Sequence, residues 1–261
     1  MRPASPFKLR TARWNSAKVL RGLTKDDVCL SREEIVNRKE FLWNAMLTEY
    51  DARNLAKYLT TRAIGSSPEF LLFKRAWSHD EWNHYLGFRQ LYSMLYDEPE
   101  AKIAEQLEMD SGNFELIAEF LDDEFKVCLV LAYDEIATFK SYLAEFPFYK
   151  ALDMRVFRWF QRVTKDELNH FLNCMEIIRC KHSARSSEIA STIDMFIKWD
   201  IERHPYLRTF ILDHYWYSQR FLEHCGELIG DYLSKGLRGV SFATRVETNE
   251  TEMIFKRYKY L

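Results

Sequence analysis

One five-residue motif occurs twice in the sequence, as Asp-Glu-Trp-Asn-His at 80–84 and as Asp-Glu-Leu-Asn-His at 166–170. Residues three apart in an α-helix lie on the same face, so the Glu and the His of each copy can bind one metal ion together. A single Glu-x-x-His pair is a weak signal, because short motifs arise by chance. Two copies that also share the first Asp and the Asn before His predict the two halves of one metal site.

A site built from two such pairs needs two more carboxylates, one from each remaining helix of a bundle. Glu135 lies in an apolar stripe with helical spacing, and a carboxylate buried there must find a cation, a proton or a metal ion. Glu49 lies in a corresponding stripe, and it precedes Glu81 by 32 residues. Glu135 precedes Glu167 by the same interval. Asp51 is the alternative to Glu49, and we favour Glu49 because Asp51 falls on a more polar helix face.

The expected metal ligands are therefore four carboxylates and two imidazoles: Glu49, Glu81, His84, Glu135, Glu167 and His170. An oxygen-rich site with two histidines suits iron, with manganese as a substitute. We expect Asp80 and Asp166 to accept the second N–H of a ligand histidine, each from the opposite helix. Tyr142 lies two turns after Glu135 on the same face, which makes it a candidate catalytic residue, as a radical or hydrogen-bonding group.

This pattern resembles the ferritin-like di-iron carboxylate superfamily. The resemblance covers roughly residues 31 to 182 and depends on Glu49, Glu135 and the two Glu-x-x-His pairs. Asp-Glu-x-x-His written twice is similar to its O2-activating members: acyl carrier protein desaturases, bacterial multicomponent monooxygenases, aromatic amine N-oxygenases and the aerobic cyclase of chlorophyll synthesis. The resemblance implies an all-α fold, namely a ferritin-like four-helix bundle with additional C-terminal helices.

The resemblance also implies two iron ions, with manganese an option at one site, and the use of O2 to hydroxylate, desaturate or N-oxygenate a substrate. That substrate would be a small organic molecule or one tethered to a carrier protein. The electron donor would be a ferredoxin or a reductase. Two alternatives stay open: an iron-handling ferroxidase, and a radical-generating subunit similar to the small subunit of ribonucleotide reductase.

Two local features bear on this comparison. N-oxygenases similar to this pattern carry an extra histidine one turn before the second Glu, where this chain has Val163. His204 or His214 could supply an additional ligand from the C-terminal part of the chain, although a surface or core role is the commoner one for such a histidine. The sequence names no specific substrate.

Helix signals place these residues on long elements. Ser31 with Glu34 forms a capping-box signature, and Ser67 with Pro68 marks another helix start. Pro147 is expected to end a helix. The helices expected from these signals and from the apolar periodicity span 31–64, 68–96, 114–145, 149–181, 187–203 and 207–235, with a polar connector after the second. We expect one domain with an N-terminal arm (1–30), a di-iron core (31–182) and a C-terminal extension (183–261).

Composition agrees with a helical protein. Of the 261 residues 47% are apolar and 29% charged, while eight Gly and six Pro are few for a many-turned β protein. The formal net charge of −2 and the mixed signs along the chain argue against nucleic acid as a partner. Five cysteines without a Cys-x-x-Cys pair indicate reduced thiols. No run is apolar enough to predict a membrane span, and we expect a cytoplasmic protein, for which a homodimer is one option.

Overall fold

The computed structural model describes residues 7–109, 112–202, 208–214 and 216–235. Within these ranges the protein is all-helical and has no β-strand, so the predicted all-α class is confirmed. The α-helices are α1 (Ser16–Val19), α2 (Arg32–Asn37), α3 (Lys39–Thr61), α4 (Pro68–Tyr96), α5 (Glu100–Met109), α6 (Glu124–Leu152), α7 (Met154–Lys181), α8 (Ile189–Glu202) and α9 (Gln219–Lys235). Short 3-10 helices cover Lys25–Asp27, Phe114–Phe120 and Ser183–Glu188.

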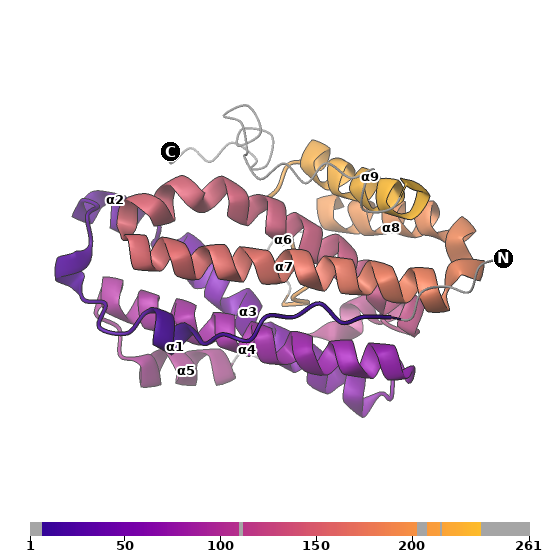
Figure 1. Ribbon diagram of the computed structural model, residues 1–261, viewed down its shortest axis with the longest axis horizontal. Coiled ribbons are helices and arrows are strands. Elements are labelled where there is room, and N and C mark those ends of the chain that lie inside the picture. The colour runs from indigo at the N-terminus through magenta and orange to yellow at the C-terminus, as the bar shows by residue number, and fades with distance from the viewer. Residues whose placement is uncertain (1–6, 110–111, 203–207, 215, 236–261) are drawn as a thin grey trace.

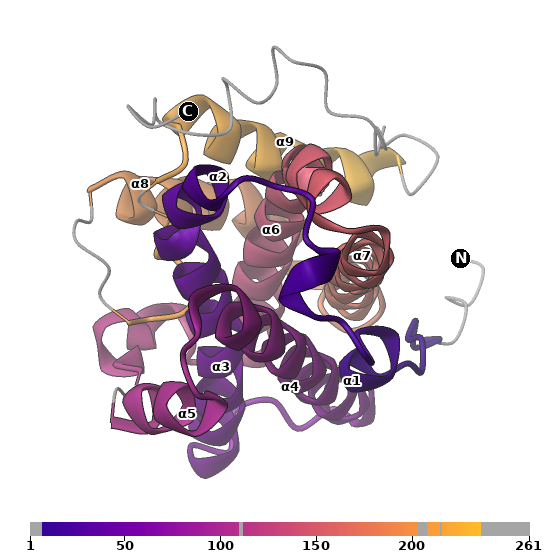
Figure 2. The same ribbon diagram turned by 90° about the vertical axis from the view of Figure 1, so that its left-hand side faces the viewer.

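The four long helices α3, α4, α6 and α7 pack together (Figure 1). α3 packs against α4 and α6 against α7, and contacts between α4 and α7 join the two pairs. α8 and α9 pack on each other and on α6, whereas α1 lies against α4 and α7 (Figure 2). Two segments far apart in the sequence therefore cover different sides of the same four helices.

Buried apolar side chains form two clusters along the four helices. On α3 one cluster ends at Tyr50 and the other begins at Ala52. On α4 the boundary between the two clusters falls between Trp77 and Tyr85, and on α7 it falls between residues 163 and 171. The residues of the repeated motif occupy these intervals, so a buried polar layer separates two apolar cores.

Helix starts follow the capping signals more closely than the continuous periodicity. Ser67 accepts a hydrogen bond from the Phe70 N–H, and α4 begins at Pro68 as predicted. The Ser31 capping box is also present, but the predicted continuous helix over 31–64 is wrong. The chain breaks at Arg38, where φ is −98° and ψ is 1°, and α3 starts after it.

The prediction that Pro147 ends a helix is also wrong, because Pro147 lies inside α6. A proline within a helix costs about 3 kcal/mol. The continuation to Leu152 offsets this cost by burying Leu152 and Tyr149 completely, and Tyr149 stacks on Phe160 with ring centroids 3.6 Å apart. Asp153 then separates α6 from α7, and its carboxylate accepts the first free N–H groups of α7.

Two other predicted helix starts are wrong. The helix expected from residue 114 begins at Glu124, after Asp123, whose carboxylate accepts from the Lys126 N–H. Residues 114–120 form a 3-10 helix with a kink at Ile117. The helix expected from residue 207 begins at Gln219, and the described residues before it, 208–214 and 216–218, are irregular. Residues 203–207 and the end of the predicted extension, 236–261, lie outside the described residues.

Residues 7–30 run along α4 and α7 (Figure 1). The Ser16 N–H donates to Asn83 Oδ1 at 2.8 Å, and the Ser16 hydroxyl donates to the Asn83 carbonyl at 2.6 Å. Near the other end of the segment, the Arg10 N–H donates to Asn173 Oδ1 at 2.8 Å. Asn83 belongs to the first copy of the motif, so the motif also holds the N-terminal segment in place.

Gly87 permits the close approach of α4 and α7. A Cβ atom at this position would lie 2.5 Å from two atoms of the buried Trp159 ring. We expect Gly87→Ala to lower the free energy of unfolding by about 1–3 kcal/mol through overpacking, despite the better helix propensity of Ala. Urea unfolding would measure this decrease in the free energy of unfolding. Gly230→Ala is the matched control, since nothing lies within 4 Å of that position. Equal stability of the two variants would contradict the packing argument.

Candidate metal centre

The six expected ligands meet in the polar layer between the two apolar cores. Their ligand atoms form two groups, in each of which the atoms lie within 4.8 Å of one another. The first group comprises Glu49, Glu81, His84 and Glu167, and the second comprises Glu81, Glu135, Glu167 and His170. Glu81 and Glu167 belong to both groups. All six residues are buried.

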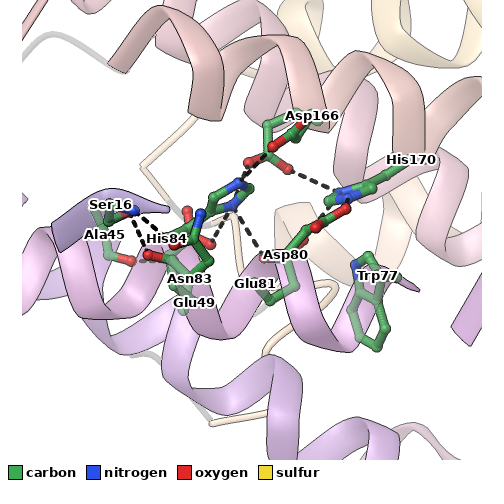
Figure 3. A network of polar contacts seen from close by, with 12 residues as sticks. Ser16, Ala45, Glu49, Trp77, Asp80, Glu81, Asn83, His84, Asp166 and His170 are labelled. Atoms are coloured by element: carbon green, nitrogen blue, oxygen red, sulfur yellow. Dashed lines mark hydrogen bonds and ion pairs between the residues drawn. The ribbon is translucent and has the colours of Figure 1, made fainter. Parts of the chain in front are cut away.

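Each imidazole directs Nδ1 toward the carboxylates (Figure 3). His84 Nδ1 lies 3.2 Å from Glu49 Oε2 and 3.2 Å from Glu167 Oε1. His170 Nδ1 lies 3.0 Å from Glu81 Oε1. Each histidine thus approaches the glutamate of the other motif copy as well as its own, because the two copies face each other across α4 and α7. The pairing of the copies explains why the motif is needed twice.

The second nitrogen of each imidazole faces the aspartate of the opposite copy. His84 Nε2 lies 3.3 Å from Asp166 Oδ2, and His170 Nε2 lies 3.5 Å from Asp80 Oδ2. A carboxylate at this place favours the tautomer with the proton on Nε2 and leaves Nδ1 free to bind a metal. Both aspartates therefore lie beside the histidine of the opposite helix, as predicted from the sequence.

Glu49, and not Asp51, is the α3 residue within these groups. Asp51 is fully buried but accepts from the Asn54 amide at 3.0 Å and lies 3.4 Å from Arg208 Nη2. Tyr142 lies at the site, and its hydroxyl donates to Glu49 Oε1 at 2.7 Å. Tyr142 is therefore hydrogen-bonded to the carboxylate cluster through Glu49.

Burial and crowding shift the protonation of the cluster. Burial raises the pKa of Glu81, and the neighbouring Glu167 carboxylate raises it further. Burial also raises the pKa of Glu135. For His84 burial acts in the opposite direction, but the carboxylates, Glu49 first, outweigh it and raise its pKa well above the ordinary value. In the absence of a metal ion, the ionised forms of Glu81 and Glu135 are therefore disfavoured.

A metal pair fits two carboxylate oxygens that make no hydrogen bond within the chain. Glu81 Oε1 and Glu167 Oε1 are buried and make no hydrogen bond, although each faces the Nδ1 atom of a histidine, at 3.0 Å (His170) and 3.2 Å (His84). Both belong to the carboxylates that the two ligand groups share. Buried carboxylate oxygens that make no hydrogen bond are costly, and a coordinated cation would remove that cost. Four ionised carboxylates would be neutralised by two divalent cations, so the donor set suits such a pair in charge as well as in geometry.

Two tryptophans also contact the cluster, and neither contact was predicted from the sequence. Trp14 Nε1 donates to Asp166 Oδ2 at 2.6 Å, and its ring stacks on His84 with centroids 5.9 Å apart. Trp77 Nε1 donates to Glu135 Oε1 at 2.7 Å. Trp77 lies one turn before Glu81, so helical spacing could have found it. Nothing in the sequence near Trp14 signals its contact, which depends on the path of the N-terminal segment.

We expect Trp14→Phe to weaken metal binding about tenfold, because Phe keeps the stacked ring but removes the donor that orients Asp166 behind His84. Competition with a chromophoric chelator would measure the affinity. Trp43→Phe is the control, since Trp43 contacts Tyr92 away from the ligands. An unchanged affinity in Trp14→Phe would show that the hydrogen bond does not orient the ligand.

A cavity of about 60 Å³ lies beside the carboxylates. It is lined by all four glutamates of the two groups and by neither His84 nor His170. The cavity thus reaches the cluster on the face that the imidazoles leave open. Its other lining residues come from α3, from α6 and from the segment between α8 and α9: Phe41, Asn44, Ala45, Thr48, Asp134, Thr138, Ser141, Tyr142, Phe210, Asp213, His214, Trp216 and Tyr217.

Residues 208–214 and 216–218, here called the covering segment, lie over this cavity and are held by contacts with the surrounding helices. Arg208, Phe210 and Leu212 adopt positive φ angles of 62°, 64° and 58°, a conformation that costs energy for residues other than glycine. The Tyr217 hydroxyl donates to Ser141 Oγ at 2.8 Å. The surrounding helices therefore hold a strained backbone in place over the cluster.

His214 belongs to this cover and not to either ligand group. Its Nε2 lies 2.7 Å from Asp134 Oδ1, and its Nδ1 lies 2.9 Å from Asp200 Oδ2. Burial opposes the charge, but the two aspartates, Asp200 first, raise the pKa of His214 to about 10. His214 thus links α6 and α8 as a charged group. His204, the other candidate for an extra ligand, lies outside the described residues.

Comparisons with protein-family models, with curated proteins and with solved structures found no match to this chain. Among the helices of the described residues, none combines the length and the apolar character that a membrane crossing requires.

Proposed function

We propose that this chain is a non-haem di-iron oxidoreductase that uses O2 to oxidise an organic substrate, on a ferritin-like four-helix bundle formed by α3, α4, α6 and α7. One observation carries the proposal: two ligand groups share Glu81 and Glu167, and a cavity meets the four carboxylates on the face without histidines. Shared carboxylates suit a pair of ions, and the cavity gives O2 and a substrate a place next to it.

The chain's own residues would have distinct tasks. Glu49 and Glu135 would each help to hold one ion, while Glu81 and Glu167, which belong to both groups, would help to hold both. Two iron ions would supply the reduction of O2, with electrons from an external donor such as a ferredoxin or a reductase. Asp80 and Asp166 would keep the proton of each imidazole on Nε2. The covering segment would keep bulk water from the cavity.

Tyr142 is the candidate catalytic residue of the chain itself. Its hydroxyl donates to Glu49 Oε1, and its side chain lines the cavity. It can therefore exchange a proton with the carboxylate and contact a bound substrate at the same time. Burial raises the pKa of Tyr142 well above the ordinary value, and the nearby Glu49 carboxylate raises it further, so the hydroxyl keeps its proton at neutral pH.

Metal analysis and optical spectroscopy on the purified full chain test the proposal. We expect about two irons per chain, with ferric absorption that bleaches on anaerobic reduction and returns when O2 is added. Protein that stays metal-free after expression with added iron would contradict the proposal. Iron in large excess over two per chain would favour the ferroxidase or storage alternative instead, and a stable tyrosyl radical signal would favour a radical-generating subunit.

A further inference from the structure

The wall of the cavity beside the glutamate cluster combines aromatic rings with acids. Five aromatic side chains line it: Phe41, Tyr142, Phe210, Trp216 and Tyr217. Two carboxylates outside the ligand groups, Asp134 and Asp213, also line it. Among the described residues that line the cavity, none is a lysine or an arginine. The wall is therefore rich in groups that attract a cation.

An anionic substrate would lack a partner in this wall. The basic side chain there is His214, whose two ring nitrogens already lie within 2.9 Å of Asp134 and Asp200. Among the described lining residues no lysine or arginine is present to pair with a buried carboxylate or phosphate group, which would lose its hydration without compensation.

A cationic substrate would find two kinds of partner. Each carboxylate can accept several hydrogen bonds, so Asp134 and Asp213 can keep their present contacts and still accept from an ammonium group. The Asp213 carboxylate now accepts from the Thr209 N–H at 2.9 Å. Aromatic faces attract organic cations through their ring electrons, with Trp the strongest. The metal pair would not repel the cation, because the four glutamates neutralise two divalent ions.

The size of the cavity limits the ligand. One enclosed water needs about 10–15 Å³ of such space, so a cavity of about 60 Å³ holds roughly four to six waters. A ligand of similar extent has about as many non-hydrogen atoms. With the covering segment in place, the cavity therefore suits a small free molecule better than a long chain tethered to a carrier protein.

From these observations we propose that the substrate is a small organic amine, bound as a cation between the carboxylates and the aromatic rings of the cavity. The inference rests on the proposed function, because it takes the cavity beside the metal pair as the substrate site. It names the substrate class of that site. Asp213 and Trp216 would be specificity-determining residues, since they line the cavity without belonging to the ligand groups.

Calorimetric binding to the metal-loaded full chain tests this. The probes are propylamine, 1-propanol and propionate, which are similar in size, and tetramethylammonium, which cannot coordinate a metal because it has no lone pair. We expect propylamine and tetramethylammonium to bind at least about tenfold more tightly than 1-propanol and propionate. Binding of propionate as tight as that of propylamine, or binding of none of the probes, would overturn the proposal.

A matched pair of variants locates the site. Asp213→Asn keeps an oxygen that can accept from Thr209 but removes the charge, and we expect it to weaken tetramethylammonium binding several-fold. Asp194→Asn on the exposed face of α8 is the control and should bind as the unaltered chain does. Trp216→Leu provides a second variant, with the same expected loss from the aromatic wall. Thermal unfolding of each variant shows that it is folded.

The two proposals can fail separately. If the chain holds about two irons that cycle with O2 but prefers propionate, the substrate inference is wrong and the proposed function stands. If tetramethylammonium binds and Asp213→Asn weakens it, while the metal shows no reaction with O2, the cavity assignment holds and the oxidoreductase proposal is wrong. Equal binding by Asp213→Asn and the unaltered chain would overturn the placement of the cation.

Discussion

Glu167→Gln is expected to lose both metal ions, whereas Glu49→Gln is expected to keep about one, because Glu167 belongs to both ligand groups and Glu49 to one. Glutamine preserves the size of the side chain but is a poor ligand for a hard cation. In Glu49→Gln the second group, with Glu81, Glu135 and His170, stays intact. Metal content by mass spectrometry, measured per chain after identical loading and dialysis, distinguishes one ion from none.

Glu227→Gln on the exposed side of α9 is the control for this pair, and it should load as the unaltered chain does. Circular dichroism should show full helix content in all three variants, since an amide in place of a buried carboxylate removes repulsion within the metal-free cluster. Retention of about one ion in Glu167→Gln would contradict the shared role of Glu167. Complete loss of metal in both variants would contradict independent binding and show that the two ions bind only together.

The positions of the site residues were predictable because helix geometry fixes them locally. A spacing of three places Glu81 beside His84, and the repeat of the motif on α7 gives the opposing half. The equal intervals from Glu49 and Glu135 to the motif glutamates selected the remaining carboxylates. These arguments need only the register of long helices, and α4 in particular has the predicted bounds.

The features that the sequence did not predict depend on contacts between distant segments. Pro147 stays helical because Tyr149 gains a buried stacking partner on α7, which no local rule contains. Residues 208–214 and 216–218 are irregular although a helix was expected from residue 207, since the surrounding helices hold left-handed residues such as Phe210 in place. Trp14 reaches Asp166 across 152 positions of the chain.

Protons and metal ions would compete for the same buried groups. In the metal-free chain, burial and then the Glu167 carboxylate raise the pKa of Glu81 above 4.5. The pKa of His170 is also raised, because Glu135 and Asp80 outweigh the effect of burial. The folded state therefore keeps protons that the unfolded state releases. Stability from such groups is full below the unfolded pKa and is lost as the pH rises through the folded pKa.

Raising the pH from about 5 to about 8 is thus expected to lower the Tm of the metal-free chain, since Glu81 and His170 both act in this direction. Glu167, whose pKa the two histidines lower against the effect of burial, stays ionised throughout this range and does not reverse the trend.

Metal binding should oppose this loss of stability, because ions replace the protons. At 100 times the Kd, ferrous iron added without O2 would contribute about 2.7 kcal/mol, or roughly 5–10 °C in Tm. Differential scanning calorimetry with and without iron measures both effects. Glu81→Gln, which cannot titrate at this position, should show a smaller pH slope when metal-free. Two results would contradict this account: a metal-free Tm that rises with pH, or an iron-induced increase in Tm that becomes smaller as the pH rises. Either would mean that protons bound to the cluster do not stabilise the folded state.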